Sequence, residues 1–271
     1  MSTQDQIQQS DAWDSLAAQY DEANATTADA IAVQALGILG VTPGQNVLDV
    51  AAGPGYFSLR AAEVGAKVLA IDFSQGMVDH LRDKVQRLGI EGLRTEVMDG
   101  QDLKLEDNSF DIAYSSLGIM LFPDRAAGMR EFYRVLKPGG MGAIVALTGL
   151  EDHGIQSQVM SALNKVMPDF ERAGSDPRFS LANPDIFRAE MMSAGFSRVN
   201  MFTVRIVEPF DSPEVLWKRI GHSPVVSRLA NNLTESQIQT LGDNFVEQIR
   251  STQGDGPYGM KYQVRIAVGV K

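Results

Sequence analysis

Acidic and glycine residues are gathered in one short stretch of the chain, in a pattern that suits the binding of a nucleotide-like ligand. An apolar run that begins at Val47 is typical of a buried strand, and a helix is expected to follow it. Asp49 lies at the end of the strand, and Gly53 and Gly55 occupy the turn. Glycine lets the backbone approach a ligand where any Cβ would intrude. The stretch therefore predicts a nucleotide-recognition turn.

Two kinds of turn match this pattern. A dinucleotide-binding turn, G-x-G-x-x-G, needs a third glycine where this chain has Ser58. The run instead fits Asp-x-Ala-x-Gly-x-Gly, with Ala51 as its second member. In these residues the chain resembles the class I S-adenosylmethionine-dependent methyltransferases. Their cofactor carries a sulfonium and an ammonium group and no pyrophosphate, so an aspartate suits it better than a helix N-terminus offered to phosphate.

Two further acidic positions follow in the order expected for this family. Asp72 ends a second apolar run, and the resemblance implies that its carboxylate binds the ribose hydroxyls. Dinucleotide enzymes have a similar residue, so Asp72 does not separate the two classes. The run Asp99-Gly100-Gln101 resembles the family's adenine-binding turn, with Asp99 accepting from the adenine amino group. A plain Asp-Gly turn is the alternative.

The resemblance implies more residues around the same cofactor. Phe73 and Met77 follow Asp72, and Ser115 ends an expected fourth strand, residues 110–116. A substrate wall is expected to begin after this strand, although its residues could equally be ordinary core. They are Leu117, Met120 and Phe122.

Strand and helix patterns alternate through residues 46–147. Asp124 is placed to begin a helix that the sequence Leu-Lys-Pro-Gly-Gly, residues 136–140, is expected to end before a strand at 142–147. This ending is a further family motif with a structural role. Such alternation is typical of a doubly wound parallel sheet that binds its ligand at the carboxyl ends of its strands.

The N-terminal residues 1–45 predict two helices. The first contains Trp13 and Tyr20 at helical spacing, and the second ends near Gly40. Similar methyltransferases often open with a run like W-x-x-x-A-x-x-Y-D, which matches this chain up to Asp21 and closes over the cofactor. The resemblance therefore implies a lid with Tyr20 in the site. Two helices packed on a sheet edge are the alternative.

The second half of the chain completes the expected fold. Strands are expected at 199–207 and 262–270, and the polar and apolar alternation of the last one predicts an antiparallel strand. Helical insertions at 151–182 and 209–260 are expected to form a substrate cover or, for the later one, a dimer contact. The prediction for 1–271 is one α/β domain with a Rossmann-like, doubly wound, seven-stranded sheet, mostly parallel with the last strand antiparallel.

Composition narrows the partners. The 271 residues carry a formal net charge of −10, which argues against nucleic acid and favours a small molecule. The chain has no cysteine, so disulfides and thiolate metal sites are impossible. No N-terminal apolar run is typical of a signal peptide or a membrane span, and the cytoplasm is the expected location.

Methyl transfer is an in-line displacement that needs positioning above all, and proximity can supply ~7–11 kcal/mol of the barrier. A general base is needed only for a protonated acceptor, and histidine is the usual one near neutral pH. His153 follows the fifth strand and is the candidate, with a surface role as the alternative, whereas His80 is expected to be solvated. No His, Asp and Glu spacing predicts a metal site.

The sequence thus predicts an enzyme that moves a methyl group from S-adenosylmethionine to a small-molecule acceptor, most simply at oxygen, in a hydroxyl or a carboxyl group. Within the family it looks closest to the group that includes quinone-biosynthesis C-methyltransferases, so carbon or nitrogen stays open as the acceptor. An NAD(P)-dependent oxidoreductase and a non-catalytic cofactor-binding module are the other hypotheses.

Overall fold

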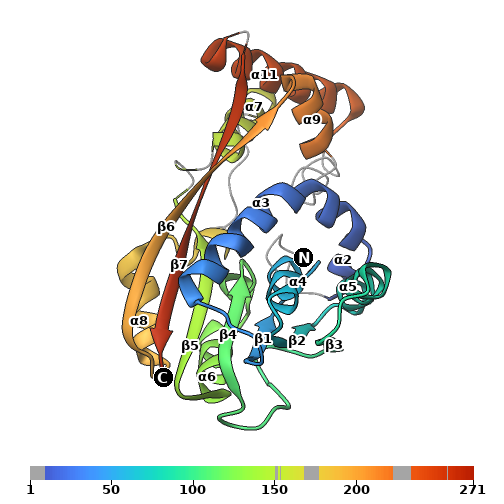
Figure 1. The fold of residues 1–271 in the computed structure, drawn as a ribbon. Helices are drawn as coiled ribbons and strands as arrows, with labels where there is room; N and C mark the ends of the chain where they lie inside the picture. Colours follow the sequence, from blue (N-terminus) through green and yellow to red (C-terminus); the bar gives the residue numbers. More distant parts are fainter. Residues whose placement is uncertain (1–9, 150–151, 153, 168–176, 222–232, 255) are drawn as a thin grey trace.

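A seven-stranded sheet organises the computed structural model, which describes residues 10–149, 152, 154–167, 177–221, 233–254 and 256–271 (Figure 1). The strand order is β3-β2-β1-β4-β5-β7-β6, and β7 runs antiparallel to both of its neighbours. The other pairings are parallel, as predicted. The strands are β1 (Asn46–Val50), β2 (Lys67–Asp72), β3 (Leu93–Val97), β4 (Phe110–Ser116), β5 (Leu136–Leu147), β6 (Ser197–Phe210) and β7 (Tyr258–Val270).

Helices α4 (Tyr56–Glu63), α5 (Gln75–Leu88), α6 (Arg125–Arg134) and α8 (Pro184–Ser193) connect or flank the strands. The predicted helix start at Asp124 is confirmed by its cap, and Ser74 caps α5 in the same way. Ser74 Oγ accepts from Met77 N at 3.1 Å, and Asp124 Oδ1 accepts from Ala127 N at 2.8 Å. Leu88, the last residue of α5 before Gly89, is 57% exposed.

The chain begins with α2 (Ser10–Asp14) and α3 (Ala17–Leu39). Two helices were expected here, but the break lies at residues 15–16, and α3 then runs unbroken to Gly40, whose left-handed conformation ends it. The middle of α3 is polar, so no apolar periodicity marked it as helix. Its second half buries Ile31 and Ala35 in the main core, and the helix contacts α4, α5 and β6.

The Leu-Lys-Pro-Gly-Gly segment differs from its expected role as a helix end. Helix α6 stops at Arg134, and Leu136 already pairs with Phe110 of β4. The register between β4 and β5 then shifts before Met141 pairs with Ile112. The segment is therefore an irregular start of β5, because Pro138 has no N–H to continue a helix.

Strands β6 and β7 extend beyond the rest of the sheet. β5 pairs only with residues 264–270 of β7, and from there the two strands continue as a two-stranded ribbon (Figure 1). At its far end lie α7 (Gly154–Val166), α9 (Pro213–Gly221) and α11 (Glu235–Gln253), which we call the head. The head has a hydrophobic cluster of its own, whose buried members are Val159, Ala162, Leu163, Leu216, Leu241, Phe245 and Ile249.

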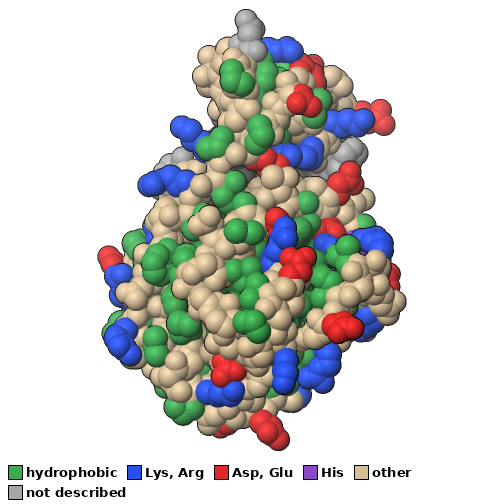
Figure 2. Space-filling model, in the orientation of Figure 1, with side chains coloured by type: hydrophobic (Ala, Val, Ile, Leu, Met, Phe, Trp, Pro, Cys, Tyr) green, Lys and Arg blue, Asp and Glu red, His purple; other side chains and the backbone are tan. Residues whose placement is uncertain are grey.

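Charges of both signs are mixed on the face of the molecule that Figure 2 shows. Figure 2 shows Lys and Arg side chains interspersed with Asp and Glu side chains over one face, with the head as the narrower upper part. None of the described helices combines the length and apolar character needed to cross a membrane.

Candidate functional site

The turn after β1 has an unusual backbone. Gly53 and Gly55 have φ of 52° and 77°, and the non-glycine residue Ala51 has φ of 55°. Across from it, Leu117 has φ of 57° after β4. Positive φ is uncommon for such residues, and strained positions of this kind cluster at ligand sites. The carboxyl ends of β1 and β4 are therefore the first place to look for a site, as expected for this sheet.

Asp72, at the end of β2, holds this turn. Its Oδ2 accepts from Gly53 N at 2.9 Å and its Oδ1 accepts from Ser74 N at 3.0 Å. Burial raises the pKa of Asp72 to about 6, against the lowering effect of the backbone hydrogen bonds from Ser74 and Gly53. A carboxylate has about four acceptor positions, so two remain for ligand hydroxyls. Asp72 thus has a structural role in addition to the predicted one.

Asp49 lies deeper, with 2% of its surface exposed. Ser58 Oγ donates to its Oδ2 at 2.6 Å. Burial raises the pKa of Asp49 to about 7, and the nearby Asp72 carboxylate adds to the effect of burial. A cation placed here would favour the ionised form of both carboxylates.

Two adjoining cavities open around the turn, an outer one of about 180 Å³ and an inner one of about 70 Å³. Gly53 lines both, and a Cβ added there would meet nothing within 4 Å, so it would project into open space. Its absence of a side chain therefore matters for a ligand and not for packing. The other residues that line both cavities are Tyr20, Ala51, Ser116 and Leu117.

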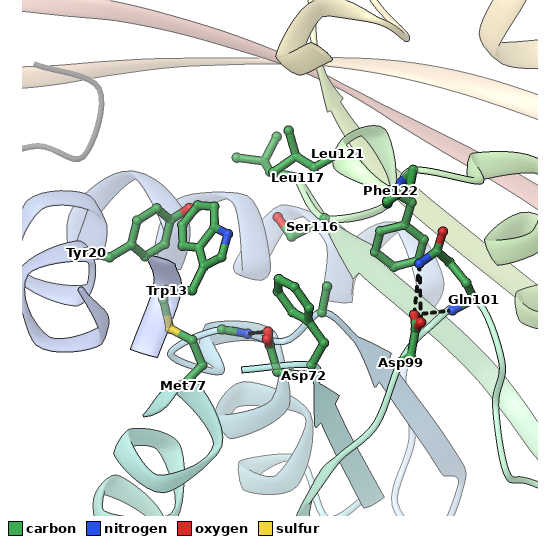
Figure 3. Close-up of a pocket in the computed structure, with 15 residues that line it drawn as sticks. Trp13, Tyr20, Asp72, Met77, Asp99, Gln101, Ser116, Leu117, Leu121 and Phe122 are labelled. Carbon is green, nitrogen blue, oxygen red and sulfur yellow. Dashed lines mark hydrogen bonds between the residues drawn. The ribbon is translucent and has the colours of Figure 1, made fainter. Parts of the chain in front are cut away.

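The outer cavity has an acidic side and an aromatic cover (Figure 3). Asp72 and Asp99 line it from the ends of β2 and β3. Trp13 and Tyr20 come from α2 and α3, with their rings edge to face at 5.6 Å. Four side chains give it an apolar wall, namely Phe73, Met77, Leu121 and Phe122.

Asp99 is exposed and already hydrogen-bonded. Its Oδ1 accepts from Gln101 N at 2.9 Å and from Gln101 Nε2 at 3.1 Å (Figure 3). Gln101 Oε1 in turn accepts from Asp124 N at 2.7 Å, at the start of α6. Both Asp99 and Gln101 line the outer cavity. The carboxylate keeps acceptor capacity on Oδ2, so an adenine amino group remains a compatible donor.

The inner cavity is bounded by α3, α4, β4 and β7. Phe57 and Tyr114 stack at 3.7 Å between ring centroids and form its back wall. Asp49 lines it, and so does Tyr262 of β7, a residue with no signal in the sequence. Asn24, Thr27 and Ile31 also line it, and they extend the helical spacing that begins at Tyr20. That spacing could have identified them from the sequence.

Four of the expected site residues do not line either cavity. A Cβ on Gly55 would lie 2.3 Å from the Leu81 side chain, and one on Gly100 would lie 2.7 Å from the Phe122 ring, so both are packing positions. Ser115 is fully buried, and neighbouring side chains on a strand point to opposite faces, so Ser116 faces the cavities instead. Met120 is 4% exposed and belongs to the core.

The predicted base cannot be placed, because His153 lies outside the described residues, as does His222. His80 is not simply solvated as expected, since its Nε2 lies 2.7 Å from Asp21 Oδ2. Among the residues that the structure describes, no histidine lines either cavity. The same residues contain no group of His, Asp and Glu that could hold a metal ion.

The predicted cover over the site is seen only in part. From the described chain, α2 and α3 supply Trp13 and Tyr20, but no described residue of 151–182 or 209–260 lines either cavity. The head lies at the far end of the β6–β7 ribbon instead (Figure 1).

Comparison with known proteins identifies the family of this chain. The methyltransferase domain family matches residues 48–144. An uncharacterised protein of Mycobacterium tuberculosis is 36% identical over 109 residues, which are 40% of this chain and 39% of that protein's length. A demethylmenaquinone methyltransferase of Corynebacterium glutamicum is 32% identical over 161 residues, which are 59% of this chain and 67% of the relative.

A solved structure shows the same fold. The YcgJ protein of Bacillus subtilis is 19% identical and superposes with a TM-score of 0.57 over 89% of this chain and 97% of its own. The acidic residues at the ends of β1 and β2 and the open space beside Gly53 suit the ammonium and ribose groups of the family's cofactor. With the relatives and the order of its motifs, these features show that the chain belongs to the class I S-adenosylmethionine-dependent methyltransferases.

Proposed function

We propose that this chain transfers a methyl group from S-adenosylmethionine to a hydroxyl oxygen of a small molecule. The observation that carries the proposal is the pair of adjoining cavities at the carboxyl ends of β1, β2 and β4, with a buried carboxylate at Asp49 and another at Asp72. The cofactor has an ammonium group at one end and a ribose further along. The deeper carboxylate, Asp49, would suit the first, and Asp72 would suit the second.

The cofactor would lie across both cavities. In the outer one, Asp72 would accept from the ribose hydroxyls and Asp99 from the adenine amino group, with Phe73 and Phe122 beside the base. In the inner one, Asp49 would face the ammonium group. The site residues Tyr20, Ala51, Gly53, Met77 and Gln101 line the outer cavity and would complete the binding surface.

When bound, the cofactor supplies an electrophilic methyl group on a sulfonium. The protein's own residues would bind and orient the two reactants and exclude water. Trp13 and Tyr20 cover the outer cavity (Figure 3), and such closure favours displacement reactions. A hydroxyl acceptor loses its proton as the carbon–oxygen bond forms. His153 remains our candidate to receive that proton.

The choice of a hydroxyl rests on the charge of the walls. No Lys, Arg or His is among the described residues that line the two cavities, whereas Asp49, Asp72 and Asp99 are. An anionic acceptor such as a carboxylate would find no cationic side chain there, and only the cofactor's own sulfonium and ammonium groups would offset its charge. Neutral polar groups, which suit a hydroxyl, include Asn24, Thr27 and Tyr262.

A carbon acceptor is the second candidate, because the Corynebacterium glutamicum relative is named as a demethylmenaquinone methyltransferase. The test begins with calorimetry, in which S-adenosylmethionine should bind and NADH should not. A metabolite extract is then incubated with cofactor carrying a ¹³C-labelled methyl group. A labelled methoxy carbon in the product spectrum would support oxygen, and a labelled C-methyl carbon would replace that part of the proposal.

A further inference from the structure

The two aromatic residues that cover the outer cavity are each followed by an aspartate. Trp13 precedes Asp14 at the end of α2, and Tyr20 precedes Asp21 near the start of α3. Both carboxylates reach α5, the helix that also supplies Met77 to the cavity. The cover is therefore attached to the sheet core at two points.

The first attachment lies at the N-terminus of α5. Asp14 Oδ1 accepts from Ser74 Oγ at 2.5 Å and from Gly76 N at 3.0 Å. A Cβ on Gly76 would lie 2.4 Å from the backbone oxygen of Asp14, so only glycine permits this approach of α2. A carboxylate is also favourable beside the positive end of a helix dipole.

The second attachment is a buried cluster around Asp21. Lys84 Nζ donates to Asp21 Oδ2 at 3.0 Å, His80 Nε2 lies 2.7 Å from the same oxygen, and the Tyr56 hydroxyl donates to Oδ1. The side chains of Asp21 and Lys84 are only 17% and 10% exposed. Burial acts to raise the pKa of Asp21, but the hydrogen bonds from His80, Tyr56 and Lys84 outweigh it, so the pKa lies below its usual range.

The attachments lie along one face of α5, because Gly76, His80 and Lys84 follow each other at four-residue spacing. Tyr56 adds a direct link to the site, since it lines the inner cavity. The attached cover leaves cavities of about 180 and 70 Å³. Ligand pockets typically measure roughly 300–1,000 Å³. Movement of the cover would widen the space that Trp13 and Tyr20 border.

We propose that Asp14 and Asp21, with their partners on α4 and α5, form a clasp that holds Trp13 and Tyr20 over the cavity and must open for cofactor exchange. This inference rests on the proposed function, because it takes the cofactor to bind beneath these two rings. Asp21 acts through Tyr20 and is a positioning residue. The clasp slows entry and release of the cofactor together.

The test measures both rates with S-adenosylhomocysteine by stopped-flow fluorescence, for which Trp13 is a reporter within the cavity. The variants are Asp21→Asn and Lys84→Met, the second of which keeps an unbranched apolar stem against the Tyr56 ring. Asp29→Asn is the matched control. It breaks an α3–α4 ion pair, Asp29 with Arg60 at 2.8 Å, and Asp29 lines neither cavity.

In both clasp variants the association and dissociation rates should each rise roughly tenfold, which corresponds to about 1.4 kcal/mol at the barrier, while the affinity changes less than either rate. In Asp29→Asn both rates should stay within about twofold of the original chain, because an exposed pair contributes little. If only the dissociation rate rises, Asp21 merely stabilises the bound state and the clasp is wrong. Rates like those of the control would also overturn it.

Limited proteolysis without ligand separates this inference from the proposed function. Cleavage near residues 14–21 should be faster in Asp21→Asn and Lys84→Met than in Asp29→Asn. If the original chain binds no S-adenosylhomocysteine, the proposed function fails, and the proteolysis result still shows whether the clasp exists. Equal cleavage in all three variants would contradict the clasp, whatever the ligand.

Discussion

In the sheet core, residues 46–147, acidic side chains lie at the carboxyl ends of neighbouring strands and face a cavity, whereas in the head the buried side chains are aliphatic or aromatic. In the core the positions of the strand ends matter. Asp72 accepts a hydrogen bond from the Gly53 amide across the turn, and its charge helps to raise the pKa of Asp49. The head needs only apolar faces that meet. Chemistry and packing are thus divided between two parts of the chain.

Because of this division, we expect a substitution in the head to lower the stability of the head strongly without changing cofactor binding. Phe245 is fully buried in the head cluster. Phe245→Ala should destabilise the head by about 3–5 kcal/mol, as expected for a cavity left by a large ring. Cofactor affinity should stay within about twofold, since no described head residue lines either of the two cavities at the turn after β1. Thermal unfolding and calorimetry on the same variant measure the two quantities, and a loss of binding would show that the regions are not separate.

The corresponding change in the core is Asp72→Ala. It removes the acceptor for the amides of Gly53 and Ser74, both within the turn region. The Ser74 amide is buried and would be left unsatisfied, which should cost roughly 1–3 kcal/mol in the free energy of unfolding, whereas the Gly53 amide lines the cavities. The resemblance implied only a ribose-binding role for Asp72. Asp72→Asn is the control, because its side-chain oxygen keeps one acceptor, and denaturant unfolding of the two variants should separate the structural role from ligand binding.

A smaller effect is expected from pH, which should change cofactor affinity through Asp49 in the core. Without ligand the Asp49 pKa is raised to about 7, and an ammonium group beside it would favour ionisation. Cofactor affinity should therefore fall by up to about tenfold for each pH unit below about 7 and be nearly constant above it. Calorimetry between pH 5 and pH 8 would measure this.

Asp49→Asn is the companion variant. It should bind the cofactor roughly tenfold or more weakly at pH 8, because a hydrogen bond to a charged group is worth about 1.5–3 kcal/mol, and its affinity should no longer depend on pH near 7. Its ligand-free fold should be more stable than the original at pH 8. A buried acid with a raised pKa stabilises the fold below its unfolded pKa, and this contribution is lost as the pH rises to about 7. An unchanged pH profile would assign the titration to another group.

The same contrast explains what could be predicted from the sequence. Several signals of the core are local, because the caps Ser74 and Asp124 act within three residues of their own positions. The bond from Gly53 N to Asp72 spans nineteen residues and has no such local signal. Ser115 was expected in the site, but its neighbour Ser116 lines the cavities. Adjacent residues of a strand face opposite sides of the sheet, and the sequence did not show on which side the cavities would lie. Tyr262 was missed, because only the crossing of β7 beside α3 brings it to the inner cavity.

Long-range partners were the other gap. His80 and Lys84 have no local pattern that marks them as partners of Asp21, about sixty residues earlier. The insertion at 209–260 was expected from its length to cover the substrate or to make a dimer contact. Its described residues line neither cavity at the turn after β1. Sequence spacing predicts contacts within one element better than contacts between elements.

One side-chain network joins the two regions and gives the smallest and sharpest test. Glu208 of β6 is 5% exposed. Its Oε2 accepts from Thr27 Oγ1 of α3 at 2.9 Å and its Oε1 from Arg219 Nη1 of α9 at 2.6 Å. Thr27 also lines the inner cavity. Thr27→Val keeps the shape of the side chain and should cost about 1 kcal/mol in the free energy of unfolding.

Double-mutant cycles then show how far this link couples the regions. Thr27→Val and Arg219→Met share Glu208, so their effects on urea denaturation should be non-additive by roughly 0.5–3 kcal/mol. Thr27 contacts Glu208 and Phe245 contacts Trp217, so the effects of Thr27→Val and Phe245→Ala should add within about 0.5 kcal/mol. Strong coupling in this second cycle would mean that the head and α3 unfold as one unit. The head would then influence the cavity through Glu208 and Thr27, and not through any residue that lines it.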